Sequence, residues 1–317
     1  MPDTGLLQRF LIRSSDGFVL AFHEISPSHL VDLVECLRPA QAVPLAEIVK
    51  RTRDAKSSSG LFAITVDDGI GDNVRSLTRV FLSRGWPATF YLPTQYLDTG
   101  NGMAFQWWRL VLPLLPRMRL ELSSGSIDLS TPEAVRELSK KMETLWYTKR
   151  LEAYSQITVE LAGIVSRIWG AEALQPPAPI SWAEVEKFSK TDLIRFESHG
   201  VSHAAMSSLT DDELVLEMKH SREIITEHTG RACRHLAYPF GSARSIGTRS
   251  VEIAKRFYDS ASTLIGGRLA NANPWLLPRV PLYFKNSTFI ARLKVFLRCG
   301  PIAPVRSTSA WITASSE

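Results

Sequence analysis

Short apolar runs alternate with segments of helical periodicity along most of this chain. The runs at 18–22, 62–66 and 88–92 consist mostly of apolar, aromatic and β-branched residues, which is typical of buried strands. Between them, apolar residues recur every three or four positions over 28–37 and 73–84, which predicts two amphipathic helices. This alternation of strands and helices indicates parallel β/α units.

The alternation is interrupted between about residues 101 and 180. Ser130 and Glu133 have capping-box spacing with Pro132 in the first turn, and two helical periodicities follow before a proline-rich stretch at 174–180. We interpret this segment as a helical insertion rather than a second domain, because two helices would form only a thin core.

The alternation of strands and helices resumes after the insertion. Strands are predicted at 193–197, 235–238 and 259–264, and capping boxes that begin at Ser181 and Thr210 predict two further helices. We therefore predict an α/β fold.

The composition excludes several classes of protein. Apolar residues make up 44% and charged residues 22% of the 317 residues, as in ordinary globular chains. No apolar run approaches the ~18 residues of a membrane span, and three scattered cysteines give no disulfide framework. The net charge of +5 comes without a block of Lys or Arg, so no nucleic-acid partner is expected. The first residues lack the pattern of a signal peptide, from which we expect a cytoplasmic protein.

Two adjacent carboxylates, Asp67 and Asp68, directly follow the predicted strand 62–66. Binding and catalytic sites in parallel α/β folds gather at the carboxyl ends of strands. One carboxylate could bind a metal while the other acts as a base. A solvated Asp-Asp-Gly turn accounts for the same residues, so this motif by itself leaves both interpretations open.

Two histidines, His199 and His203, follow the predicted strand 193–197. Their spacing would place both imidazoles on one side of a helical turn. Two imidazoles and a carboxylate form the three-ligand set of a catalytic zinc site. Two polar loop histidines are the alternative.

Three segments together resemble the ordered motifs of the polysaccharide deacetylase family, also called the NodB-homology or carbohydrate esterase 4 family. They are Thr65–Gly69 (TVDDG), Ser198–His203 (SHGVSH) and Arg234–Gly241 (RHLAYPFG). The resemblance extends over about 18–282. It implies a distorted (β/α) barrel of about seven strands, which we place in residues 1–299 with the helical insertion. The residues at 300–317 are themselves typical of a loosely held C-terminal tail.

The resemblance also implies a divalent metal, most often zinc, with cobalt or nickel as alternatives. Asp68, His199 and His203 would be the metal ligands, and Asp67 the catalytic base. The physical chemistry agrees, because such an ion activates water and polarises an amide carbonyl.

Further roles follow from the resemblance. Arg234 would pair with Asp67 and orient it, and the backbone N–H of Tyr238 would stabilise the oxyanion. Candidate substrate-binding residues are Pro239, Arg279 and Trp108, the last because its aromatic face could stack on a sugar ring. A role in the core is the alternative for Trp108.

The chain departs from the family in the residue that protonates the leaving amine, because no His follows His235. The best substitute is His23, at the end of the predicted strand 18–22. Some family members have a Tyr-His pair there, where this chain has Phe22 and His23. A strand-end histidine with only a packing role is the alternative.

These observations predict a metal-dependent hydrolase that removes an N-acetyl group from an amino sugar during cell-surface glycan synthesis. Its substrate would be an acetylated amino sugar or oligosaccharide precursor. A weakly active or inactive metal- or carbohydrate-binding relative, and another amide hydrolase such as a deformylase, remain alternatives. The sequence leaves the oligomeric state open.

Overall fold

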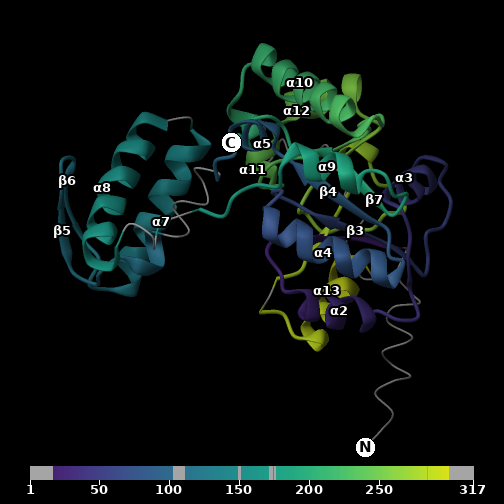
Figure 1. Ribbon diagram of the computed structural model, residues 1–317, viewed down its shortest axis with the longest axis horizontal. Coiled ribbons are helices and arrows are strands. Elements are labelled where there is room, and N and C mark those ends of the chain that lie inside the picture. The colour runs from purple at the N-terminus through teal and green to yellow at the C-terminus, as the bar shows by residue number, and fades with distance from the viewer. Residues whose placement is uncertain are drawn as a thin grey trace, which may run out of the picture. The chain divides into compact units, whose positions relative to one another are not determined.

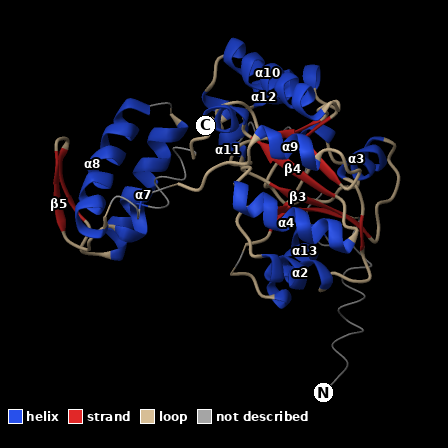
Figure 2. Cartoon of the chain, viewed as in Figure 1, coloured by secondary structure: helices blue, strands red, loops and turns tan. Residues whose placement is uncertain are grey.

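A parallel β-sheet forms the centre of the larger part of the chain (Figure 2). The computed structural model describes residues 17–102, 111–148, 151–170, 174, 176–283 and 285–299. Within these residues the sheet consists of β1 (Phe18–Phe22), β2 (Gln41–Ala42), β3 (Leu61–Val66), β4 (Ala88–Leu92), β7 (Ile194–Ser198), β8 (His235–Ala237), β9 (Ser260–Ser262) and β10 (Val280–Pro281). The strands predicted from the sequence are all present, with ends that differ by one or two residues.

The sheet curls into the predicted barrel. Its strands run parallel in the order β10-β1-β3-β4-β7-β8-β9, and β2 also pairs with β3. Leu277 forms a parallel bridge to Ser262 of β9, while Val280 and Pro281 pair with β1. One extended segment therefore contacts both edges of the sheet, which confirms the distorted (β/α) barrel.

The two faces of the strands belong to different cores. Phe18, Leu20 and Ile64 are part of the main core, which the sheet shares with the surrounding helices. Val19 and Ala63 alternate with them and belong to a smaller core inside the curled sheet, to which α3 (Leu45–Arg53) adds its buried face. This alternation allows the inside of the barrel to carry polar side chains near the strand ends.

The helices surround the sheet, and two of them begin at the predicted caps (Figure 1). Ser181 and Thr210 form complete capping boxes with Glu184 and Glu213. The helices of this part are α2 (Pro27–Glu35), α3, α4 (Gly71–Arg84), α5 (Thr94–Thr99), α9 (Trp182–Phe188), α10 (Asp211–Thr229), α11 (Ala243–Ile246), α12 (Thr248–Phe257) and α13 (Thr288–Cys299). Across the described helices, none combines the length and apolarity that a membrane crossing requires.

The insertion forms a compact unit of its own, Thr99–Pro179. It contains the hairpin β5 (Arg119–Leu122) and β6 (Gly125–Asp128) and the helices α7 (Pro132–Tyr147) and α8 (Leu151–Trp169). A separate core joins residues from both helices and the hairpin, including Leu120, Met142 and Leu161. The core of this unit is thicker than two helices would form, because β5 packs against α8 and adds Leu120 and Leu122 to it. The N-cap of α7 is Thr131 and not the predicted Ser130.

The buried imidazole of His235 makes folding stability depend on pH. Burial lowers the pKa of His235 from 6.5 to about 4, although its Nδ1 lies 2.9 Å from Ser260 Oγ. Between these values the unfolded chain binds a proton that the folded chain does not. The stabilisation that the neutral His235 imidazole contributes is therefore complete above the unfolded pKa of 6.5. It is lost as the pH falls through the folded pKa of about 4.

We expect His235→Asn to weaken this dependence, because Asn does not titrate and can still contact Ser260. Between about pH 7 and about pH 4.5 the wild-type chain should lose about 2–3 kcal/mol more unfolding free energy than the variant. Urea denaturation of both proteins at each pH measures the difference. Parallel pH profiles would contradict the assignment.

Candidate active site

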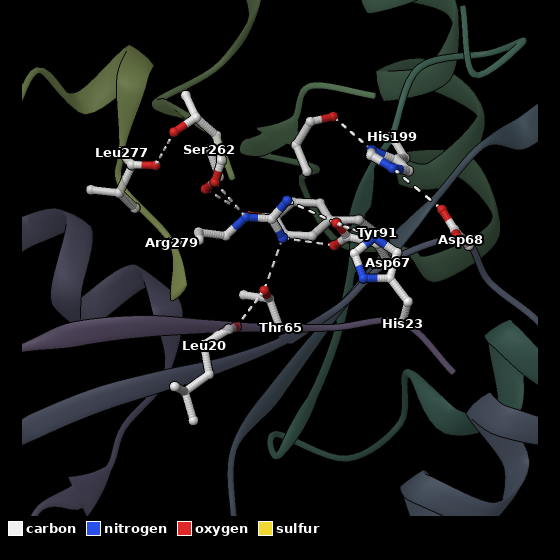
Figure 3. Close-up of polar contacts among 12 residues, drawn as sticks. Leu20, His23, Thr65, Asp67, Asp68, Tyr91, His199, Ser262, Leu277 and Arg279 are labelled. Atoms are coloured by element: carbon white, nitrogen blue, oxygen red, sulfur yellow. Dashed lines mark hydrogen bonds and ion pairs between the residues drawn. The ribbon is translucent and has the colours of Figure 1, made fainter. Parts of the chain in front are cut away.

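The polar residues singled out by the sequence converge at the carboxyl ends of parallel strands (Figure 3). His23 follows β1, Asp67 and Asp68 follow β3, and His199 follows β7. A parallel sheet brings these strand ends to one edge, which is why residues distant in the sequence meet there.

Asp68, His199 and His203 form a compact, buried group of potential metal ligands. Their donor atoms lie within 4.8 Å of one another. Oδ1 of Asp68 is 3.6 Å from Nε2 of His199 and 3.4 Å from Nε2 of His203. Nδ1 of His199 donates to the carbonyl oxygen of Ala237 at 2.7 Å, which orients the ring with its Nε2 toward Asp68. One carboxylate and two imidazoles are the donor set of many catalytic zinc sites.

The pKa shifts of Asp68 and His203 favour the binding of a cation. Burial by itself would raise the pKa of Asp68, but the adjacent rings of His199 and His203 hold that pKa well below its ordinary value. Burial lowers the pKa of the His203 imidazole. An ionised carboxylate and neutral imidazoles are the forms that bind metals.

A left-handed turn at the end of β3 aims the two carboxylates in different directions. Asp68 has a φ of 74° and Gly69 a φ of 65°. Asp tolerates this conformation better than most residues with a Cβ. At Gly69 a Cβ would lie 2.9 Å from a methyl carbon of Leu92, so space as well as backbone conformation favours glycine at this position.

The two histidines are presented by a loop, which corrects the predicted helical turn. No helix includes 199–203; instead Gly200 and His203 have φ angles of 78° and 56°. The rings still meet edge to face, with centroids 4.8 Å apart. The two rings therefore lie together as the spacing predicted, but a loop and not a helical turn brings them there.

Glu217 of α10 holds this loop and was missed by the sequence analysis. Its buried carboxylate accepts the backbone N–H groups of Val201 at 2.6 Å and Ser202 at 3.0 Å. A Cβ at Gly200 would lie 2.8 Å from the same carboxylate. The acidic residue lies on a helix rich in acids, so no local signal distinguished it.

Asp67 forms a buried bidentate ion pair with Arg279 (Figure 3). The two guanidinium–carboxylate hydrogen bonds are 2.7 and 2.8 Å long, and the side chains are 1% and 0% exposed. Arg279 also donates to Thr65 Oγ1 and to the Thr263 carbonyl. Burial would raise the pKa of Asp67, but the charge and hydrogen bonds of Arg279, together with the nearby histidines, keep the pKa below its ordinary value.

The expected roles of Arg234 and Arg279 are therefore corrected. Arg234 precedes β8 and lies at the amino end of that strand, whereas Asp67 lies at the carboxyl end of β3. The Arg234 side chain is 63% exposed and pairs with Asp259 at 3.2 Å. Arg279 was expected to contact substrate, but its buried side chain faces Asp67 instead. The signal for it was a lone charge within the apolar run at 276–282.

The expected oxyanion role of Tyr238 is also corrected. Its backbone N–H donates to the Ser262 carbonyl at 3.0 Å in the sheet, and its hydroxyl donates to the Trp275 carbonyl. The turn that follows Tyr238 approaches the potential metal ligands instead, because the centroids of the Phe240 and His203 rings are 4.8 Å apart. Pro239 is buried in this turn, and its contact with substrate stays a prediction. Trp108 lies outside the described residues.

His23 lies beside the Asp67 carboxylate. Its Nε2 is 3.8 Å from Oδ2 of Asp67, beyond hydrogen-bond distance, and its side chain is 21% exposed. The ring stacks against Tyr283, with centroids 6.4 Å apart. His23 is thus near the candidate base, partly accessible and not tied to Asp67 by a hydrogen bond.

The two arginines give a matched pair of substitutions. Arg279→Met should reduce the free energy of unfolding by about 3–5 kcal/mol, because it leaves the Asp67 carboxylate buried without its partner. Arg234→Met should change it by less than about 1 kcal/mol, since a solvent-exposed ion pair contributes little. Chemical denaturation tests both, and equal effects would contradict the assignment.

Comparison with solved structures identifies the same architecture in several proteins. The Streptococcus pyogenes deacetylase PplD in complex with acetate matches with a TM-score of 0.58, 12% identity, and coverage of 90% of this chain and 98% of PplD. A de-N-acetylase from Aggregatibacter actinomycetemcomitans matches at 0.56 and 13%, covering 89% and 99%. IcaB from Ammonifex degensii matches at 0.52 and 14%, covering 90% and 97%. At these identities the likeness shows the fold.

Sequence comparison identifies the family. No curated protein matches the sequence significantly. The family profile described as polysaccharide deacetylase matches residues 54–257, which is more than half of the chain and includes the aspartate, histidine and Arg234–Gly241 segments. The chain belongs to the polysaccharide deacetylase family.

Proposed function

We propose that this protein is a metal-dependent deacetylase that removes an N-acetyl group from an amino sugar of a glycan or glycan precursor. The observation that carries the proposal is the buried Asp68, His199 and His203 group next to the ionised Asp67. Membership of the family supports deacetylation of glycans. The group of potential metal ligands supports a metal-dependent reaction.

The donor set fits a divalent ion, and zinc is the simplest choice. The three residues are buried and close together, and the Ala237 carbonyl fixes the His199 ring. An ion bound there would supply a Lewis acid that polarises the acetyl carbonyl and acidifies water.

Asp67 is suited to accept the proton of the attacking water. The ion pair with Arg279 keeps the Asp67 carboxylate ionised and fixes its orientation. The carboxylate is therefore available as a base without a change of conformation. Because both carboxylate oxygens accept from Arg279, the guanidinium positions Asp67 and does not itself contact the substrate.

His23 is suited to donate a proton to the leaving amine. It lies on the partly accessible side of Asp67, and Tyr283 supports its ring. The amine nitrogen leaves as a sugar amine only when it is protonated, so an imidazolium at this position would complete the reaction.

Metal content tests the ligand assignment. The purified chain should bind about one zinc or similar divalent ion, and the double variant His199→Ala, His203→Ala should bind none, because one carboxylate is a poor site by itself. His220→Ala, on the exposed face of α10, is the control and should retain the metal. A native chain that binds no zinc, cobalt or nickel would overturn the proposal and favour the inactive relative.

The role of His23 is tested by product release. His23→Ala should lower kcat for acetate release from acetylated chitooligosaccharides by about 10²–10⁴-fold while metal content is unchanged. Full activity of this variant would exclude His23 as the acid. Release of formate from formylated substrates, with no acetate from acetylated ones, would identify another amide hydrolase.

A further inference from the structure

Helix α13 presents an apolar face to solvent in addition to its buried one. Ala291, Val295 and Cys299 are buried. On the outward side Phe289 is 68% exposed, Leu297 49%, and Ile290 and Leu293 40% each. At about 100° per residue, the outward apolar side chains, with Phe296, span an arc of about 120° opposite the buried face.

Cations border this exposed apolar face. Arg292 and Lys294 lie half-buried on the two sides of the arc, where they donate to the backbone carbonyls of Cys36 and Pro281. Lys285 is exposed just before the helix. Residues 285–299 contain four Lys or Arg and no Asp or Glu. An exposed apolar arc with cations at both borders is a feature of helices that lie in a membrane interface.

The positive charge around this face indicates which kind of partner could bind to it. A symmetric contact with a second copy would bring Lys285, Arg292 and Lys294 of both copies toward one another. Residues 300–317 contain one Arg and one Glu, so they offer no counter-charge. A surface of anionic lipid supplies both an apolar layer and negative charge.

From this geometry we propose that α13, yellow in Figure 1 and in contact with α2, is a docking face for an anionic membrane surface. The face adjoins the candidate active site, because the Lys294 ammonium lies 4.9 Å from the centre of the Tyr283 ring, which stacks on His23. Lipid binding at this face does not depend on the proposed reaction.

Vesicle co-sedimentation of the full chain tests the proposal. The protein should bind phosphatidylcholine vesicles that contain phosphatidylglycerol, bind pure phosphatidylcholine at least about tenfold more weakly, and be released by added salt. Phe289→Ser with Leu293→Ser should reduce binding at least about tenfold, since two exposed apolar side chains are lost. Lys285→Gln should reduce it about fivefold.

Leu216→Ser is the matched control, because Leu216 is 59% exposed on α10 far from this face in sequence. It should bind vesicles as the wild type does. Equal loss in the control, or no binding by the wild type, would overturn the proposal. A dimer that dissociates on Phe289→Ser with Leu293→Ser, seen by analytical ultracentrifugation without vesicle binding, would assign the face to a second copy instead.

Discussion

The ion pair between Asp67 and Arg279 is the interaction on which the site and the closure of the barrel both depend. A carboxylate this deeply buried is tolerated only with a partner that satisfies its charge and its lone pairs. Arg279 does so in bidentate form and also binds Thr65 and the Thr263 carbonyl, so it joins the closing segment to β3 and to the chain after β9. The orientation of the candidate base is therefore inseparable from the closure of the sheet.

The candidate metal ligands depend on a different kind of support. Asp68 and His203 both have left-handed backbones, which persist only when the surroundings hold them. For the histidine loop those surroundings are the Glu217 carboxylate and the Ala237 carbonyl, which come from a helix and from a neighbouring strand. Local strain at the site is thus balanced by contacts with the rigid scaffold.

The segment 277–299 links three features of the molecule. It closes the barrel, supplies the guanidinium for Asp67, and continues into α13 with its cationic and apolar outer face. Lys294 and Tyr283 connect that helix to His23. A surface that binds to α13 would therefore lie beside the residue proposed to protonate the leaving amine.

The sequence by itself determined the strands, the capped helices and the candidate ligands. Each of these depends on local periodicity or on residues next to a strand end. Parallel strands bring their carboxyl ends to one edge of the sheet whatever the strand order. Only the tertiary structure decided which arginine meets Asp67, that the Tyr238 N–H is used within the sheet, and that a loop presents His203. These outcomes depend on strand register, on the end of the strand a residue occupies and on long-range contacts, none of which short-range patterns encode.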